Sequence, residues 1–133
     1  AKTIVVTGGE PLMWDMDPLT YLLKTKGMQT HIETSGAYPL TGQWDWICLS
    51  PKKAKEPLAE IYAHADELKM IIHNRDDFKF AEAQAAKVSP SCKLYLQPEW
   101  SKRDKMMPEM VAYVMKNPKW IMSLQTHKYL NIP

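Results

Sequence analysis

The sequence predicts an α/β fold built on a parallel sheet. Short runs of β-branched or apolar residues alternate along the chain with loops and with stretches of helical periodicity, which is the pattern of repeated βα units. The chain has 133 residues, so we expect residues 1–133 to form a single domain. That length is too short for a complete eight-stranded α/β barrel.

The first strand and the first helix carry the clearest local signals. Residues 3–7 form an apolar run that two glycines end, as expected for a strand followed by a turn. In the helix that follows, Asp17 is expected to be the N-cap, Pro18 lies in the first turn, and Gly27 ends the helix. Leucines with helical spacing predict its buried face: Leu19, Leu22 and Leu23.

The rest of the chain repeats the same alternation. Five further strands are expected at residues 29–33, 44–49, 67–72, 93–97 and 120–124. A short helix is expected over residues 57–65, and Asp76 is expected to cap another whose inward residues are Phe78, Ala81 and Ala85. A last helix, with Pro108 near its start, has helical spacing at Met107, Met110, Val111 and Val114, and Met106 and Met115 are expected to pack with its other methionines in the core.

Composition and charge exclude several classes of protein. Hydrophobic residues make up 45% and charged residues 24% of the chain, a balance that supports a packed core. Seventeen Lys and Arg against fifteen Asp and Glu leave a net charge of +2, so neither a nucleic acid nor a membrane is expected as a partner. Cys48 and Cys92 form no CxxC motif. We therefore expect both thiols to be free and buried. We also expect the protein to lie in a reducing compartment, the cytoplasm.

Polar residues follow most of the predicted strands. In parallel α/β sheets, ligands bind at the carboxyl ends of the strands, where loops expose backbone amides and helix N-termini. The loops to consider are residues 7–11, 33–36, 50–53, 73–75, 97–99 and 125–127. We expect the functional site to lie where these loops meet.

The loop TGGEP at residues 7–11 is the most specific of these segments. Its two glycines allow a ligand to approach the backbone closely, and Glu10 adds an acceptor suited to an ammonium group. It lacks the glycine spacing of dinucleotide-binding and P-loop motifs. A plain turn between strand and helix is the alternative interpretation.

These segments together carry a resemblance to a known family. TGGEP at residues 7–11 resembles the glycine-rich motif of radical S-adenosylmethionine (SAM) enzymes. Combined with ETSG at 33–36, SPK at 50–52, LQP at 96–98 and THKYLNIP at 126–133, it is similar to the 7-carboxy-7-deazaguanine synthase family of queuosine biosynthesis. The resemblance covers essentially the whole chain and implies a partial (β/α) barrel of the radical SAM type.

The resemblance also implies roles for individual residues. It implies SAM contacts at Gly8, Gly9, Glu10, Glu33, Ser50, Lys52 and Gln97. It implies contacts with a pterin substrate at Thr7, Gly9, His127 and the terminal carboxylate of Pro133. A carboxylate there suits the guanidine-like edge of a pterin, provided that Pro133 is the true end of the protein.

The cofactors implied by the resemblance are SAM, a [4Fe-4S] cluster and Mg²⁺. In radical SAM enzymes three cysteines on a loop before the glycine motif bind the cluster, whereas Cys48 and Cys92 lie far after it. We therefore expect the cluster ligands, the Mg²⁺ ligand and a first strand to lie upstream of Ala1, so that the chain alone is not catalytic. The implied partners are a flavodoxin-like reductant and a second copy in a homodimer.

The implied reaction is the conversion of 6-carboxy-5,6,7,8-tetrahydropterin to 7-carboxy-7-deazaguanine with loss of ammonia, catalysed by a carbon–nitrogen lyase. Two alternatives are an activase of a glycyl-radical protein and a non-catalytic SAM-binding fragment. A hydrolase with Glu10 and Glu33 as acid and base is disfavoured, because no nucleophile accompanies them. His31, His64 and His73 have no spacing that suits a shared metal.

Overall fold

The computed structural model describes residues 2–132 and contains one six-stranded sheet. Its strands are β1 (Thr3–Val6), β2 (Gln29–Thr34), β3 (Trp46–Leu49), β4 (Glu67–Ile72), β5 (Lys93–Pro98) and β6 (Trp120–Met122). They lie side by side in chain order, and every neighbouring pair is parallel. The predicted α/β fold with a parallel sheet is therefore confirmed.

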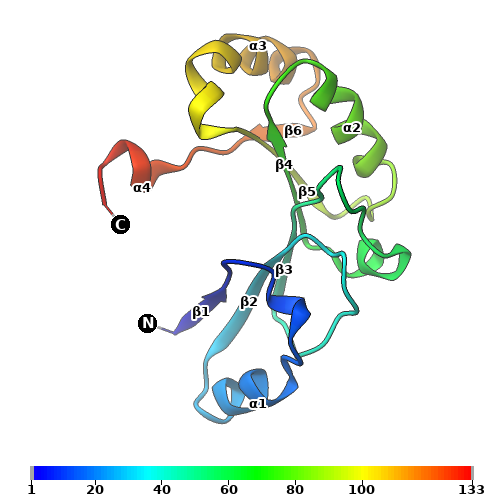
Figure 1. Cartoon of the computed structure of the whole chain (residues 1–133), viewed down its shortest axis with the longest axis vertical. Helices are drawn as coiled ribbons and strands as arrows, with labels where there is room; N and C mark the ends of the chain where they lie inside the picture. The colour runs from blue at the N-terminus through cyan, green and yellow to red at the C-terminus, as the bar shows by residue number, and fades with distance from the viewer. Residues whose placement is uncertain (1, 133) are drawn as a thin grey trace.

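Three of the four α-helices among the described residues cover one side of the sheet. The four are α1 (Asp17–Thr25), α2 (Asp76–Ala85), α3 (Arg103–Lys116) and the short α4 (Thr126–Tyr129). Helices α1, α2 and α3 lie on the outer side of the curved sheet, and α4 lies on the open side (Figure 1). The helix expected over residues 57–65 is a 3₁₀ helix, Ala59–His64. One face of the sheet is thus packed against helices, and the other is concave and open.

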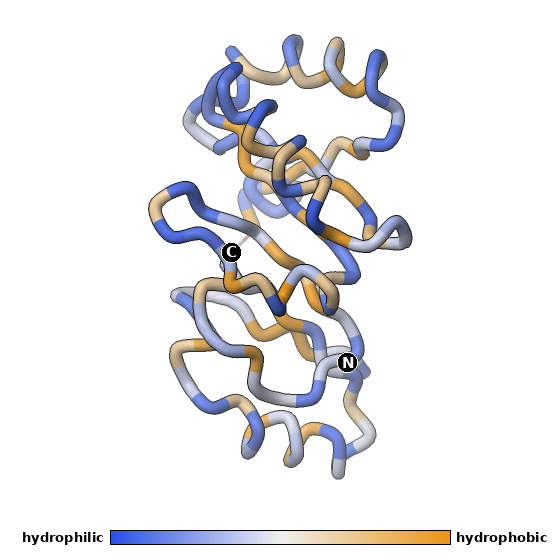
Figure 2. Tube along the Cα trace, turned by 90° about the vertical axis from the view of Figure 1, so that its right-hand side faces the viewer, coloured by the Kyte–Doolittle hydropathy of each residue, from blue (hydrophilic) through white to orange (hydrophobic). Residues whose placement is uncertain are grey.

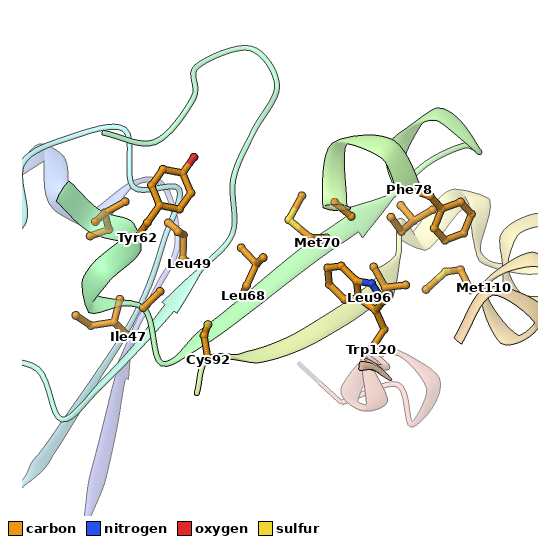
Figure 3. Close-up of a cluster of buried hydrophobic side chains, with 14 of the residues drawn as sticks. Ile47, Leu49, Tyr62, Leu68, Met70, Phe78, Cys92, Leu96, Met110 and Trp120 are labelled. Carbon is orange, nitrogen blue, oxygen red and sulfur yellow. The ribbon is translucent and has the colours of Figure 1, made fainter. Parts of the chain in front are cut away.

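The hydrophobic core lies between the sheet and these helices. Alternate strand residues point to it, including Ile47 and Leu49 of β3, Leu68 and Met70 of β4, Leu96 of β5 and Trp120 of β6 (Figure 3). Phe78 of α2 and Met110 of α3 pack against them from the helix side (Figure 3). Hydrophobic segments accordingly run through the middle of the molecule. The helices at the top and bottom of the view alternate between hydrophobic and hydrophilic residues (Figure 2).

Strand β4 shows how the sheet separates its two faces. Leu68, Met70 and Ile72 are buried, while Glu67, Lys69 and Ile71 are only partly buried. Side chains alternate across a strand, so the second set lies on the concave face. The apolar Ile71 on that face hides the alternation in the sequence, and the structure reveals a concave face that carries charge.

The predicted buried face of α1 is wrong. Leu19 and Leu22 are exposed, and the buried residue of the helix is Thr20. The Thr20 hydroxyl donates to the Met16 carbonyl at 2.9 Å and accepts from the Gln43 backbone N–H at 3.0 Å. The segment before β3 therefore packs against Thr20, and this contact orients the helix so that Leu19 and Leu22 face outward and Leu23 is only partly buried.

The two predicted aspartate caps are also displaced. Asp17 is the first helical residue of α1 and accepts a hydrogen bond from the Gly42 N–H at 2.6 Å. Asp76 is likewise the first helical residue of α2. The next residue, Asp77, accepts from the N–H groups of His73 at 2.7 Å and Asn74 at 3.2 Å. Both carboxylates predicted as caps therefore lie one position inside their helices.

Helix α3 buries two of the four methionines that were predicted to lie in the core. Met106 and Met110 are buried, whereas Met115 is 80% exposed and Val111 is also exposed. The helix begins at Arg103, before Pro108, and its buried face follows residues four apart from Met106. Met115 is more than a quarter-turn away from that face, which explains why it does not reach the core.

The cysteines are free and buried, as predicted. Burial raises the pKa of both thiols, that of Cys92 to about 11, and the negative charge of Glu67 raises the pKa of Cys48 further. Among residues 2–132, no cluster of His, Cys, Asp and Glu side chains could hold a metal ion. No helix in this part of the chain is long and apolar enough to cross a membrane.

Candidate functional site

Two adjoining cavities lie at the carboxyl ends of the strands. The larger has a volume of about 410 Å³ and the smaller about 100 Å³. Four residues line both cavities: Thr7, Glu33, Ser50 and Lys52. Gly9 and Glu10 line only the smaller cavity, and Gln97 and His127 line only the larger.

The structure therefore brings together most of the residues that the sequence singled out. They come from the segments after β1 and β3, from the ends of β2 and β5, and from α4. Because the strands are parallel, their carboxyl ends share one edge of the sheet. Gly8 lies in the same turn without lining either cavity, and Pro133 lies outside the described residues.

The turn after β1 requires its glycines for conformation. Gly8 has a φ of 82° and Gly9 a φ of 53°, and a Cβ at either position would have no heavy atom within 4 Å. Both positions are therefore in the left-handed region, where other residues are strained. Both glycines are exposed, which leaves the backbone of the turn accessible to a ligand.

Glu10 joins this turn to the turn after β2. One carboxylate oxygen accepts from the Leu12 N–H at 3.1 Å and from the Thr34 hydroxyl. The other accepts from the Ser35 N–H at 2.8 Å and the Ser35 hydroxyl at 2.6 Å. Burial by itself would raise the pKa of Glu10, but these hydrogen bonds hold it below its ordinary value. The Glu10 carboxylate, which was predicted to accept from a ligand ammonium, thus accepts from donors of the protein instead.

Ser50 has an unsatisfied hydroxyl at the junction of the two cavities. The residue is 4% exposed, and among residues 2–132 its Oγ is the one buried side-chain N or O atom without a hydrogen-bond partner. Its backbone is held in place, because the Ser50 N–H donates to the Thr34 carbonyl at 2.8 Å. A buried hydroxyl without a partner is unfavourable, so this position suits a polar atom of a ligand.

The charged groups at the site are arranged unevenly. The exposed Lys52 forms no ion pair within the described part of the chain, whereas its neighbour Lys53 pairs with the buried Asp77. Burial would raise the pKa of Asp77, but hydrogen bonds from Lys53 and from the His73 and Asn74 backbone lower it. The Lys53–Asp77 pair anchors the loop that carries Lys52, and Lys52 remains available to an anionic group.

Gln97 and His127 line only the larger cavity. Gln97 is buried, and its carbonyl oxygen lies 3.2 Å from the Ser123 hydroxyl, which donates to it. His127 is exposed in α4. Glu33 and Ser50 line the same cavity.

The donor set fits SAM and does not supply a cluster site. An α-amino acid needs a cation for its carboxylate, which Lys52 offers, and acceptors for its ammonium, which the glycine turn and Glu33 offer. The Ser50 hydroxyl offers a further hydrogen bond. The two cysteines are buried away from both cavities, so they do not form a three-cysteine site.

Lys69 belongs to the site but to none of the sequence motifs. This residue lines the larger cavity and forms an ion pair with Glu33. Its signal was the alternation in β4, where Leu68 and Met70 mark the buried face and place Lys69 on the other.

Comparisons with known proteins agree on one family. The chain is 68% identical over 133 residues to a 7-carboxy-7-deazaguanine synthase from Flavobacterium psychrophilum, with 100% of the chain and 63% of that protein covered. A protein of the same name from Synechocystis is 54% identical over 129 residues, which cover 97% of the chain and 62% of that protein. Another from Prochlorococcus marinus is 32% identical over 155 residues, with 99% of the chain and 68% of that protein covered.

A solved structure shows the same arrangement of strands and helices. The crystal structure of QueE from Escherichia coli superposes with a TM-score of 0.83 at 29% identity, and covers 94% of this chain and 57% of the QueE chain. No protein-family model matches the chain. The chain spans 63% and 62% of the length of the first two relatives. Its sequence and its fold place it in the 7-carboxy-7-deazaguanine synthase family.

Proposed function

We propose that the protein containing this chain is a 7-carboxy-7-deazaguanine synthase of queuosine biosynthesis. It would convert 6-carboxy-5,6,7,8-tetrahydropterin to 7-carboxy-7-deazaguanine with loss of ammonia, as a radical SAM carbon–nitrogen lyase. The observation that carries the proposal is the pair of adjoining cavities into which the glycine turn, Glu33, Ser50 and Lys52 all converge.

In this proposal, the chain holds the amino-acid end of SAM beside the glycine turn. The Lys52 ammonium pairs with the SAM carboxylate, and Ser50 donates the hydrogen bond that it does not make within the protein. Carbonyls of Gly8 and Gly9 and the carboxylate of Glu33 accept from the SAM ammonium and hydroxyls. Gln97 adds an amide to the larger cavity.

The pterin substrate is proposed to occupy the larger cavity next to SAM. Thr7 lines both cavities, Gly9 lines the smaller one, and His127 lines the larger one. The Pro133 carboxylate is proposed to accept from the guanidine-like edge of the pterin. The work of these groups is to orient the substrate and exclude water, because the bound cofactors supply the hydrogen-atom abstraction.

Several components are proposed to come from outside this chain. The [4Fe-4S] cluster and Mg²⁺ would be bound by other parts of the protein, since the described residues offer no metal cluster. A flavodoxin-like protein would supply electrons, and a second copy would complete a homodimer.

Turnover tests the proposed function directly. Full-length protein reconstituted with iron and sulfide, then reduced and supplied with SAM and 6-carboxy-5,6,7,8-tetrahydropterin, should form 7-carboxy-7-deazaguanine, detected by mass spectrometry. Omission of SAM should abolish the product. Cleavage of SAM without any deazaguanine product would contradict the substrate assignment and favour the alternative of a glycyl-radical activase.

Replacement of Ser50 by alanine tests the SAM site separately. We expect the dissociation constant of SAM to rise about three- to tenfold, the value of one hydrogen bond. The free energy of unfolding should change by less than about 0.5 kcal/mol, because the hydroxyl has no partner within the protein. Isothermal titration and urea unfolding measure the two quantities. Ser91→Ala, at an exposed serine before β5, is the control, and equal SAM affinities in the two variants would refute the assignment of Ser50.

A further inference from the structure

An ion pair crosses the concave face beneath the larger cavity. Glu33 lies on β2 and Lys69 on β4, with β3 between them, and Lys69 donates to Glu33 Oε1. In the sheet register Glu33 is opposite Cys48, and Cys48 is opposite Glu67. Lys69 follows Glu67 by two residues, so it lies on the same face, nearer to the carboxyl end of β4. The pair therefore spans β3 at the level where the strand leads into Ser50.

The ion pair uses only half of the Glu33 carboxylate. Within residues 2–132 no hydrogen-bond donor reaches the second oxygen, Oε2. The Lys69 side chain is 14% exposed and that of Glu33 is 36% exposed. The largely buried lysine thus lines the larger cavity, while Glu33 lines both cavities with a free acceptor.

Other groups on the same face do not compete for this pairing. Glu67 accepts from the Trp46 indole N–H at 3.2 Å and from the Cys48 thiol at 3.3 Å. Lys93, opposite Glu67 in the register, lies over the Trp46 ring at 5.7 Å from its centroid. Lys69 and Glu33 are therefore each other's partners on this face. Removal of the carboxylate would leave a largely buried ammonium unpaired, which would destabilise the folded state.

We propose that Lys69 is a positioning residue of the SAM site: it holds one oxygen of Glu33 so that the other is presented to the ligand in the cavities. This proposal rests on the proposed function, because it takes Glu33 to be a SAM contact. Lys69 itself need not touch the ligand. Its effect is to restrict Glu33 to one orientation, which removes part of the ordering cost when SAM binds.

Binding measurements on full-length protein test this role. Lys69→Met should raise the dissociation constant of SAM about tenfold, as expected when a charge-assisted contact loses its support. Lys69→Arg should restore most of the affinity, because it keeps a cation within reach of Glu33. The double variant with Glu33→Gln should bind no more weakly than Glu33→Gln alone, since Lys69 acts through Glu33. Lys93→Met is the matched control on the same face and should leave SAM affinity unchanged.

Structures of the variants separate this proposal from the proposed function. Crystal structures should show Glu33 in a new rotamer in Lys69→Met and in its original rotamer in Lys69→Arg. If the unaltered protein binds no SAM, the proposed function fails, and the Glu33 rotamers alone then decide the positioning role. An unmoved Glu33 in Lys69→Met, or SAM affinity equal to that of Lys93→Met, overturns it. Lys69→Gln, which keeps a donor without charge, replaces Lys69→Met if that variant does not fold.

Discussion

Replacement of Glu10 by alanine is expected to destabilise the protein by about 2–4 kcal/mol, because it leaves partly buried donors without their acceptor. The change removes every contact that the carboxylate makes with Leu12, Thr34 and Ser35. The turns after β1 and β2 then lose their connection, so SAM affinity should fall by about tenfold or more as well.

Urea unfolding and SAM titration of full-length protein measure the two effects. Glu60→Ala is a suitable control, because Glu60 is an exposed glutamate in the first turn of the 3₁₀ helix Ala59–His64. Unfolding free energies and SAM affinities that are the same in Glu10→Ala and Glu60→Ala would show that Glu10 does not organise the site.

The same hydrogen bonds predict how stability depends on pH. Burial acts to raise the pKa of Glu10, but its protein donors lower it below the ordinary value in the folded state. The resulting stability is present above the unfolded carboxyl pKa of about 4.3, and is lost as the pH falls through the lower folded pKa. Glu10→Gln should therefore flatten the acid side of the stability profile, measured by urea unfolding between about pH 3 and pH 7. An acid profile that is parallel to that of the unaltered protein would contradict this prediction.

The second large effect is expected at Gly36, in the turn after β2. Its φ is 74°, and an added Cβ would lie 2.6 Å from Leu49 Cδ1 and 3.0 Å from Ile61 Cγ2. Both of those side chains are fully buried. Gly36→Ala must therefore accept backbone strain and also displace the core, and we expect a loss of about 3 kcal/mol or more.

Gly27 provides a control that separates these two costs. Its φ is 69°, close to that of Gly36, but an added Cβ would meet no heavy atom within 4 Å. Gly27→Ala should therefore cost only about 1 kcal/mol, from the backbone alone. Chemical denaturation measures the free energy of unfolding of both variants. Equal losses would mean that the core around Leu49 accommodates the added Cβ without destabilisation.

Gly36 also connects the core to the site. Its N–H donates to the Thr34 hydroxyl at 3.0 Å, and that hydroxyl in turn donates to Glu10. Its carbonyl accepts from the Leu58 N–H at 2.9 Å. A displacement of Gly36 is thus expected to shift Thr34 and Glu10, and with them the turn after β1, although Gly36 lines neither cavity.

The sequence by itself determined the order of strands and helices and the edge at which the site lies. Period-two and helical spacing are local properties, so they located β2, β4 and α2 within a residue or two. A parallel sheet brings the carboxyl ends of its strands to one edge, whatever the loops contain. The sequence was therefore sufficient to predict that Ser50 and His127 lie at the same site. The terminal motif at residues 126–133 and TGGEP at residues 7–11 narrowed the family.

Only the tertiary structure decided which face of α1 is buried and which partners the charged groups choose. Thr20 displaces Leu19 and Leu22 from the interior because of a segment more than twenty residues away. Glu10 and Lys69 likewise find their partners across 24 to 36 positions of sequence. Such pairings depend on sheet register and on the packing of loops against one another, and neither leaves a periodic signal in the chain.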